Sequence, residues 1–384
     1  MTDSATTDSA TTETATTETA TTDSASVTTG RRARTGRTGR TSPRLPGRRG
    51  SKLHSWAHAL ATTNPPPGVA IDELDGVTRW LVVTRAAVLP MTLVSGLVAG
   101  LLAARSPSLS VGYLLLAIVG ILAAHVANNL SNDLFDTSVG TDTSAYPRAL
   151  YAPHPLLTGL VSKRTLWTAI AAANVVDLVV LVVLTIARGP LTVVLAVAGL
   201  VLSFAYTAPP LRLKKIGLGE PDVLVVWGPL MTGGTYFAAT GSLPAWVLAA
   251  SLPWALLCTT VLFGKHTDKI PYDAPDGTRT LPVILGERRA RAVTLALMVA
   301  FYLVVVLDVL VGALPWPALL ALLGVERLVR AWPHLRHQAP AEPPAGFPIW
   351  PLWFAAVAFV HLRRAGLLLV VGLALSAATG WGAR

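Results

Sequence analysis

Long hydrophobic stretches alternate with short polar segments from about Trp80 to the end of the chain. Each stretch has about 18–25 mainly apolar residues, the length that an α-helix needs to cross a hydrocarbon core of about 30 Å at about 1.5 Å per residue. We therefore expect an all-α membrane bundle. Eight clear spans are predicted near residues 80–104, 109–131, 165–187, 189–206, 221–240, 245–264, 291–313 and 315–332.

The last hydrophobic stretch, residues 350–381, is too long for one span and is interrupted by His361, Arg363 and Arg364. We expect residues 350–364 to lie in the membrane interface and residues 365–381 to form a further span. The pattern thus predicts a polytopic bundle of about nine transmembrane helices.

The basic residues predict the orientation of these spans. With the N-terminus inside, 28 of the 31 Lys and Arg residues fall in segments on the inner face. Only Arg105, Arg188 and Arg384 fall elsewhere. Because cytoplasmic segments carry the excess of positive charge, we expect a multi-pass protein of the cell membrane whose N-terminus and longer polar loops are cytoplasmic.

Composition agrees with a membrane protein. Hydrophobic residues make up 52% of the chain and charged residues only 14%, against about a quarter charged in a soluble domain. A net charge of +10 would suggest nucleic acid in a soluble chain, but the topology explains it here, so no nucleic-acid partner is expected. The single cysteine, Cys258, excludes a disulfide framework and a thiolate metal cluster.

The N-terminal region differs from the rest. Residues 1–25 repeat the unit TTDSA or TTETA, which has no large apolar side chain to bury and should be disordered. Residues 30–52 are strongly basic and are either a contact with anionic lipid headgroups or a solvated linker. We therefore divide the chain into a disordered, low-complexity and basic tail (1–78) and a membrane domain (79–384).

Candidate chemistry lies in the polar loops of the predicted inner face. The second span runs into NNLSNDLFDTSVGTD, where Asn129, Asp133 and Asp136 share one helical face, and Asp142 follows Gly140.

The loop after the sixth span adds a second group of acids, Asp268, Asp273 and Asp276. Mg²⁺ prefers carboxylate and phosphate oxygens as ligands. Two acidic clusters on one membrane face therefore predict a metal-bridged diphosphate site, and solvated loop acids are the alternative.

Three blocks resemble the UbiA superfamily of intramembrane prenyltransferases. Residues Asn132–Asp136 with Asp142 resemble its first Asp-rich motif, in the spacing of the branch that prenylates dihydroxynaphthoate for menaquinone. Residues Tyr206–Glu220 are similar to the middle loop of that branch, and residues 273–281 resemble the second Asp-rich motif. The resemblance covers residues 79–384. This chain departs from it in having His154 where many relatives have arginine, and one extra residue between Asp268 and Asp273.

The resemblance implies that a polyprenyl group is transferred from its diphosphate to an aromatic or quinone-precursor acceptor in the membrane, with Mg²⁺ as cofactor. Asp133, Asp136 and Asp273 would be catalytic through the metal. The full set of implied metal ligands is Asp133, Asp136, Asp142, Asp268 and Asp273. The implied substrate-binding residues are Asn129, Tyr206, Arg212, Lys214 and Lys265.

Simpler interpretations remain for several of these residues. Arg212 and Lys214 also fit ordinary anchors of the positive-inside pattern, and Tyr206 fits an interfacial tyrosine. Asp177 and Asp308 lie within apolar runs, where we expect hydrogen bonds between helices. An ion-coupled transporter that uses these acids is the rival function, although the chain shows no internal repeat typical of one. A scaffold with a basic tail would leave the paired acidic clusters unexplained.

Overall fold

The computed structural model of the protein describes residues 51–138, 140, 143–347 and 349–380. All regular elements in this part of the chain are helical, which confirms the all-α class. The N-terminal repeat, which is predicted to be disordered, lies outside the described residues. Most of the basic stretch also lies outside them.

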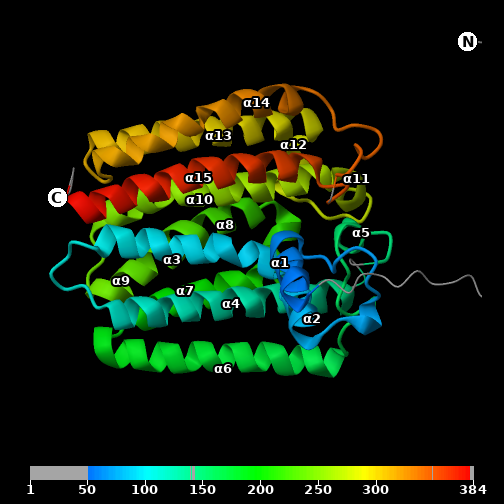
Figure 1. Ribbon diagram of the computed structural model, residues 1–384, viewed down its shortest axis with the longest axis horizontal. Helices are drawn as coiled ribbons and strands as arrows, with labels where there is room; N and C mark the ends of the chain where they lie inside the picture. Colours follow the sequence, from blue (N-terminus) through cyan, green and yellow to red (C-terminus); the bar gives the residue numbers. More distant parts are fainter. Residues whose placement is uncertain (1–50, 139, 141–142, 348, 381–384) are drawn as a thin grey trace, which may run out of the picture. The chain divides into compact units, whose positions relative to one another are not determined.

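The helices of the described residues follow one another along the chain (Figure 1). Their bounds are α1 Lys52–Thr62, η1 Ile71–Glu73, α2 Gly76–Val83, η2 Ala86–Val88, α3 Leu89–Ala103, α4 Val111–Ser138, α5 Pro147–Tyr151, α6 Lys163–Arg188, α7 Leu191–Thr207, η3 Leu213–Ile216, α8 Gly219–Val225, η4 Val226–Gly233, α9 Gly234–Thr240, α10 Ala245–Asp268, α11 Ile270–Asp273, α12 Leu281–Leu285, α13 Glu287–Leu310, η5 Trp316–Gly324, α14 Val325–Arg336 and α15 Trp353–Thr379.

Helical segments occupy all the predicted spans, but not all are single helices. Within the described part, six helices are long and apolar enough to cross a membrane: η2 with α3, α4, α6, α10, α13 and α15. The fourth predicted span is the shorter α7. The fifth is a succession of α8, the π-helical η4 and α9, and η4 contains Pro229, which has no N–H to donate. The eighth is η5 followed by α14.

The predicted division of the last hydrophobic stretch is wrong. Residues 353–379 form one helix, α15, in place of an interfacial segment followed by a span. The helix continues because its polar side chains have partners. The buried His361 has Nε2 2.9 Å from the hydroxyl of Tyr302, and the exposed Arg364 has Nε 3.5 Å from Glu326 Oε1.

The boundary predicted at residue 78 also needs correction, because the ordered domain includes α1. Ala59 of α1 is fully buried in an apolar cluster with side chains of α2, α4 and α6. The indole Nε1 of Trp56 donates to Asp75 Oδ1 (3.0 Å), and the amide of Asn64 donates to the carbonyl of Tyr151 (3.1 Å). Residues 51–78 therefore pack against one end of the bundle and belong to the ordered domain.

The core of the bundle is built around α10, which packs against η4, α13 and α15. Its Trp254 and Leu257 are buried with Phe301 of α13 and Leu369 of α15. Small residues allow close approach of the helices. A Cβ atom on Gly264 of α10, for example, would lie 2.7 Å from the backbone oxygen of Phe354.

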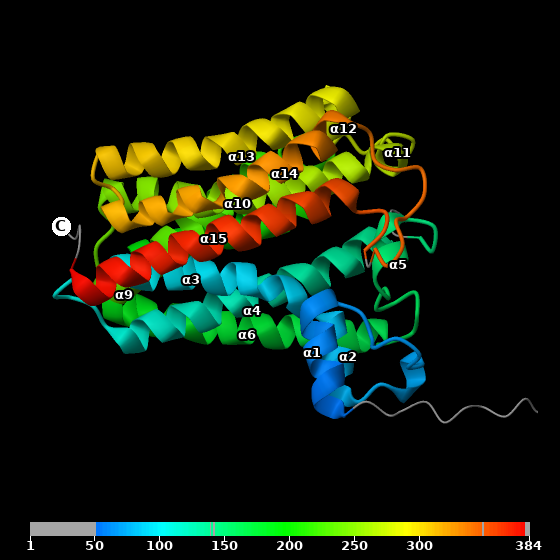
Figure 2. The ribbon, with the colours of Figure 1, turned by 45° about the horizontal axis from the view of Figure 1, so that its top comes forward.

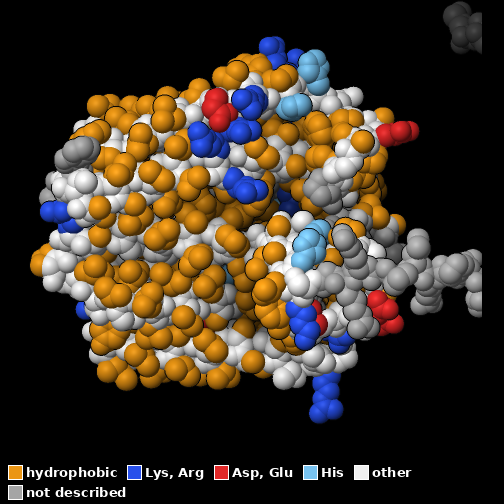
Figure 3. Space-filling model, in the orientation of Figure 1, with side chains coloured by type: hydrophobic (Ala, Val, Ile, Leu, Met, Phe, Trp, Pro, Cys, Tyr) orange, Lys and Arg blue, Asp and Glu red, His pale blue; other side chains and the backbone are white. Residues whose placement is uncertain are grey.

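The outer surface is largely apolar, as Figure 3 shows for one face. Leu178 and Ile186 of α6 and Leu303 and Leu310 of α13 are all more than half exposed. Exposed apolar side chains along helices of this length suit contact with lipid. The protein is therefore a multi-pass membrane protein.

One end of the bundle gathers the polar connections. Figures 1 and 2 show α5, α11 and α12 at the same end, where α4 and α10 also finish and where α1 crosses the bundle. The two acidic clusters, far apart in sequence, therefore reach the same end of the bundle.

Candidate active site

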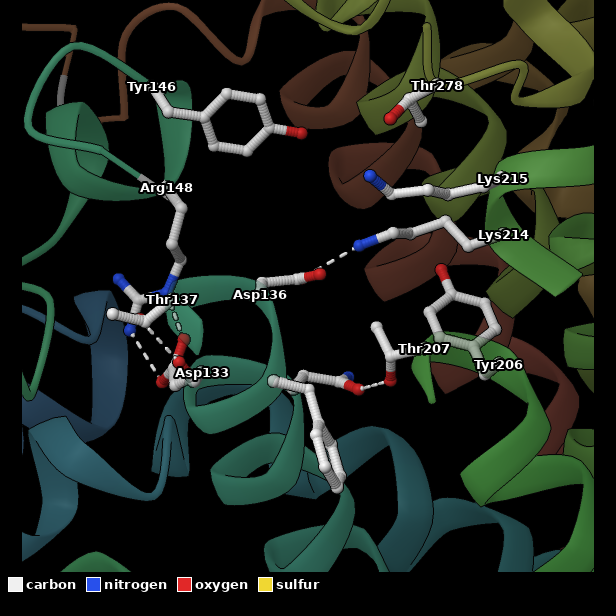
Figure 4. A network of polar contacts seen from close by, with 12 residues as sticks. Asp133, Asp136, Thr137, Tyr146, Arg148, Tyr206, Thr207, Lys214, Lys215 and Thr278 are labelled. Atoms are coloured by element: carbon white, nitrogen blue, oxygen red, sulfur yellow. Dashed lines mark hydrogen bonds and ion pairs between the residues drawn. The ribbon is translucent and has the colours of Figure 1, made fainter. Parts of the chain in front are cut away.

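The first acidic cluster lies in the last turns of α4. Asp133 is fully buried there. Arg148 of α5 binds its carboxylate as a fork, with Nε 3.0 Å from Oδ1 and Nη2 3.1 Å from Oδ2 (Figure 4). Arg85, which has a positive φ of 55° between α2 and η2, donates its Nη2 to the same Oδ1. Two guanidinium groups thus compensate the buried charge of Asp133.

His154 completes the surroundings of Asp133. Its Nδ1 accepts from the backbone N–H groups of Leu156 (3.3 Å) and Leu157 (3.4 Å). The ring proton therefore belongs on Nε2, which lies 3.6 Å from Asp133 Oδ1 and 3.3 Å from Thr137 Oγ1. His154 thus faces the carboxylate of Asp133.

Lys214 and Lys215 of η3 lie between the two acidic clusters. Lys214 Nζ donates to Asp136 Oδ2 at 2.8 Å (Figure 4). Lys215 Nζ lies 3.6 Å from Asp276 Oδ2, in the loop after α11. Arg212, with a positive φ of 46°, precedes η3, and its Nε has no hydrogen-bond partner among the described residues. The middle loop therefore brings cations to both clusters.

Asp273 of α11 is the buried acid of the second cluster. Its Oδ1 accepts from the hydroxyl of Tyr146 at 2.5 Å, and Lys269 Nζ lies 3.8 Å from the same oxygen. The ammonium of Lys269 also lies 4.3 Å from the ring centroid of Tyr146. Burial lowers the pKa of Lys269 to about 8, although the nearby Asp273 partly opposes this shift.

Asp268 does not join this cluster. Its Oδ1 and Oδ2 accept the backbone N–H groups of Phe354 and Ala355, each at 2.8 Å. These are N–H groups of the first turn of α15, which have no partner within their own helix. Both oxygens of Asp268 therefore cap the start of α15, and its role as a metal ligand stays a prediction.

A second buried polar chain lies beside the acids. Glu220 Oε1 is 2.7 Å from His266 Nδ1, and both side chains are buried. His266 Nε2 lies 3.5 Å from the hydroxyl of Tyr206. This arrangement orients the hydroxyl of Tyr206, which lines a cavity in the bundle.

A cavity of about 670 Å³ leads from these polar groups into the bundle. At its polar end it is lined by Arg85, Asn129, Asn132, Arg148, Tyr151, Tyr206 and Lys265. Farther in, its walls are apolar side chains of α6, α7, η4 and α9, such as Leu184, Leu200, Leu230 and Phe237. One space therefore joins a cationic end to an apolar chamber.

Asp177 of α6 lies on the wall of this cavity, with Asn174 one turn away. The described part of the chain gives the Asp177 carboxylate no hydrogen-bond partner, so its predicted bond to another helix is wrong. Asp308 of α13 is buried, and its Oδ2 has no hydrogen-bond partner within the same described part.

Tyr151 of α5 faces the same cavity. Burial alone would raise the pKa of its hydroxyl, but the positive charges of Lys265, Arg148 and Arg85 outweigh burial and lower it to about 8. The positive charges of Lys265, Arg148 and Arg85 make this end of the cavity cationic.

The acids of the site differ in whether their carboxylate oxygens are available to bind a metal ion. Among the described residues, no three His, Cys, Asp or Glu side chains converge as a ready-made metal cage. Asp273 Oδ2 is buried there without a hydrogen-bond partner, as suits an oxygen that binds a cation. Asp136 uses Oδ2 for Lys214, and both oxygens of Asp133 already accept from arginine. Asp142 lies outside the described residues.

The profile of the UbiA prenyltransferase family matches residues 92–359 of the chain. The chain belongs to this family. It is therefore an intramembrane polyprenyltransferase, and the resemblance read from the three sequence blocks is confirmed.

Two curated UbiA relatives are similar over most of the membrane domain. The chain is 28% identical to the 2-carboxy-1,4-naphthoquinone phytyltransferase of Synechocystis sp. over 65% of this chain and 78% of the relative. It is 27% identical to the 1,4-dihydroxy-2-naphthoate octaprenyltransferase of Haemophilus influenzae over 56% of this chain and 71% of the relative.

A solved structure shares the UbiA fold with this chain. The apo structure of a UbiA homologue from Aeropyrum pernix K1 superposes with a TM-score of 0.55 at 18% identity, over 75% of this chain and 98% of the homologue. This similarity supports the helical fold that places the two acidic clusters at one end.

The structure adds residues of this UbiA-family site that the sequence analysis missed. Arg148, Tyr146 and Tyr151 come from the loop after α4, and Glu220 and His266 form a buried pair. In the sequence, Arg148 is only one of the 28 basic residues of the predicted inner face. In the sequence, Glu220 and His266 are notable only because they lie in predicted polar loops. That position does not predict the contact between their side chains.

Proposed function

We propose that this UbiA-family enzyme prenylates a hydroxylated naphthoate or a related quinone precursor, with Mg²⁺. The observation that carries the proposal is the cavity, which joins a cationic end to an apolar chamber. A polyprenyl diphosphate has the same division, with a charged head and an apolar tail. The acceptor class follows from the two relatives whose names specify naphthoquinone and naphthoate substrates.

The charges of the site suit departure of a diphosphate. Arg148 of α5 and Lys265 of α10 line the polar end of the cavity, and the positive charge of Lys269 acts on Tyr151 in the same lining. Lys214 is fixed nearby on Asp136. Positive groups held in place before the reaction stabilise negative charge as it develops on the leaving oxygen. The apolar walls keep water from the allylic carbon, so that the aromatic ring is the nucleophile that reaches it.

Asp136 and Asp273 are the acids that we assign first to Mg²⁺, and Asp133 and Asp142 stay assigned as further ligands on the sequence motif alone. Mg²⁺ binds through few carboxylates and shares its remaining positions with water and phosphate oxygens. When bound, it would neutralise charge on the diphosphate. The buried Oδ2 of Asp273, which has no hydrogen-bond partner among the described residues, supports this assignment.

Product analysis tests the function. We expect purified protein with Mg²⁺, a polyprenyl diphosphate and 1,4-dihydroxy-2-naphthoate to form a prenylated product that mass spectrometry detects. Hydroxybenzoate serves as the competing acceptor. A product from hydroxybenzoate alone would contradict the acceptor class, and no product from a panel of diphosphates and acceptors would contradict the proposed transfer.

We also propose that the end carrying α5 and α11 faces the cytoplasm, as the distribution of basic residues indicates. Single cysteines at Gly277, in the loop after α11, and at Ser242, between α9 and α10, should then react with an impermeant maleimide from opposite sides of the membrane. The native Cys258 is buried and provides the unlabelled background. Labelling of both positions from one side would overturn the topology.

A further inference from the structure

A cluster of charged side chains lies on the outer face of α14 and α15, away from the active-site cavity. We call Arg327 and Arg330 of α14 with Arg363 and Arg364 of α15 the α14–α15 basic cluster. The two helices pack against each other. Arg330, Arg363 and Arg364 are exposed, and none of the four arginines lines the cavity. Figure 3 shows basic side chains gathered with an acidic one over these helices.

Positive charge exceeds negative charge in this cluster. Glu326 Oε1 lies 3.1 Å from Arg327 Nε and 3.5 Å from Arg364 Nε, so one carboxylate oxygen serves two guanidinium groups. Within the described part of the chain, Arg330 and Arg363 have no acidic partner. Four arginines thus face one glutamate.

The cluster is also set within an apolar surface. Val360, Arg363, Arg364 and Leu367 follow the spacing of one helical face, and all four are exposed. Arg363 lies ten residues after Trp353, the first residue of α15, so it is about 15 Å along the helix. Uncompensated charge beside apolar, lipid-facing side chains is costly. Long arginine side chains reduce that cost by reaching toward a polar layer.

We propose that the α14–α15 basic cluster binds the phosphate headgroup of an anionic phospholipid, in the leaflet on the side of the active-site loops. Arginine binds phosphate oxygens through paired N–H donors. Basic pockets between membrane helices recognise anionic headgroups in this way. The exposed Val329, Val360 and Leu367 supply apolar contacts for the acyl chains beside the headgroup.

Native mass spectrometry of the full-length protein tests this site. The protein is exchanged into neutral detergent and titrated with phosphatidylglycerol or with phosphatidylcholine of the same acyl chains. We expect wild type to retain phosphatidylglycerol preferentially. The variant Arg363→Gln/Arg364→Gln should lose at least about tenfold in apparent affinity for it, because headgroup attraction falls with each basic residue removed.

The matched control is Arg288→Gln/Arg289→Gln. These two residues are also adjacent, exposed arginines, and they lie in the first turn of α13. The control should retain phosphatidylglycerol like wild type. Glu326→Gln should bind it more tightly, an opposite change that loss of folding cannot produce.

Several outcomes would overturn the proposal. Equal retention of the two phospholipids by wild type, or equal losses in both double variants, would show general attraction without a site. Preferential occupation of the cluster by polyprenyl diphosphate would show that it receives substrate instead. Dissociation of an oligomer in the Arg363→Gln/Arg364→Gln variant, with lipid retention unchanged, would show an interface between two copies of the chain.

Discussion

Replacing Asp136 by asparagine is expected to lower prenyl transfer at least about a hundredfold, which corresponds to about 2.7 kcal/mol of barrier. The substitution keeps the size of the side chain and removes the charge that holds Lys214 at 2.8 Å. In the proposed site it also removes a metal ligand, so charge developing on the diphosphate is less well stabilised. Steady-state turnover of purified protein in detergent measures the effect.

Asp133→Asn should cause a loss at least as large, for a partly different reason. Asp133 is fully buried between Arg85 and Arg148. Removing its charge leaves two guanidinium groups without their counter-ion, which is strongly destabilising for a buried pair. Thermal unfolding of each variant separates this structural cost from a loss of turnover.

Asp276→Asn is the control for both substitutions. Asp276 belongs to the same end of the bundle, but its side chain is 43% exposed and pairs with Lys215 at 3.6 Å. The Asp276→Asn variant should retain most of the wild-type activity, because exposed ion pairs contribute little.

EDTA should abolish wild-type prenyl transfer until Mg²⁺ is restored. Wild-type turnover in both Asp136→Asn and Asp133→Asn, or full activity in EDTA, would contradict the assignment of these acids to Mg²⁺.

The bundle was predictable from sequence because hydropathy reports membrane crossing directly. Helices occupy all the predicted spans, since every apolar run of that length must satisfy its backbone groups within itself. The interruption predicted near His361 is absent because side chains of other helices contact the polar residues of α15. Tyr302 and Glu326 provide partners for His361 and Arg364, and hydropathy along one segment carries no information about partners on other helices.

The acids of the site were also predictable, but their partners were not. The spacing of Asp133 and Asp136 places them on one helical face whatever the rest of the chain does. By contrast, Tyr146 meets Asp273 across 127 positions, and Lys214 meets Asp136 across 78. Such pairs depend on how loops fold over the end of the bundle. Lys214, which is predicted to bind the diphosphate, therefore donates to the carboxylate of Asp136 in the structure.

Substitution of the two neighbouring acids should affect different properties: turnover for Asp273 and stability for Asp268. Asp273→Ala removes the acceptor of Tyr146 and the buried oxygen that has no hydrogen-bond partner among the described residues, so turnover should fall at least about tenfold. Asp268→Ala removes the acceptor for two N–H groups at the start of α15. It should cost about 1–2 kcal/mol of stability, as loss of a helix cap does, with turnover per folded molecule near that of wild type.

Asparagine substitutions at the same two positions separate capping from charge. Asn is a good capping residue, so Asp268→Asn should restore most of the stability that Asp268→Ala loses. Asp273→Asn keeps an acceptor for Tyr146 but carries no charge for a cation, and it should remain as inactive as Asp273→Ala. Thermal unfolding and turnover are measured on all four variants. Equal losses of turnover at both positions would place both acids on the metal, and a fully active Asp273→Ala would remove this loop from the site, because no other described carboxylate of the second cluster is both buried and free to bind a cation.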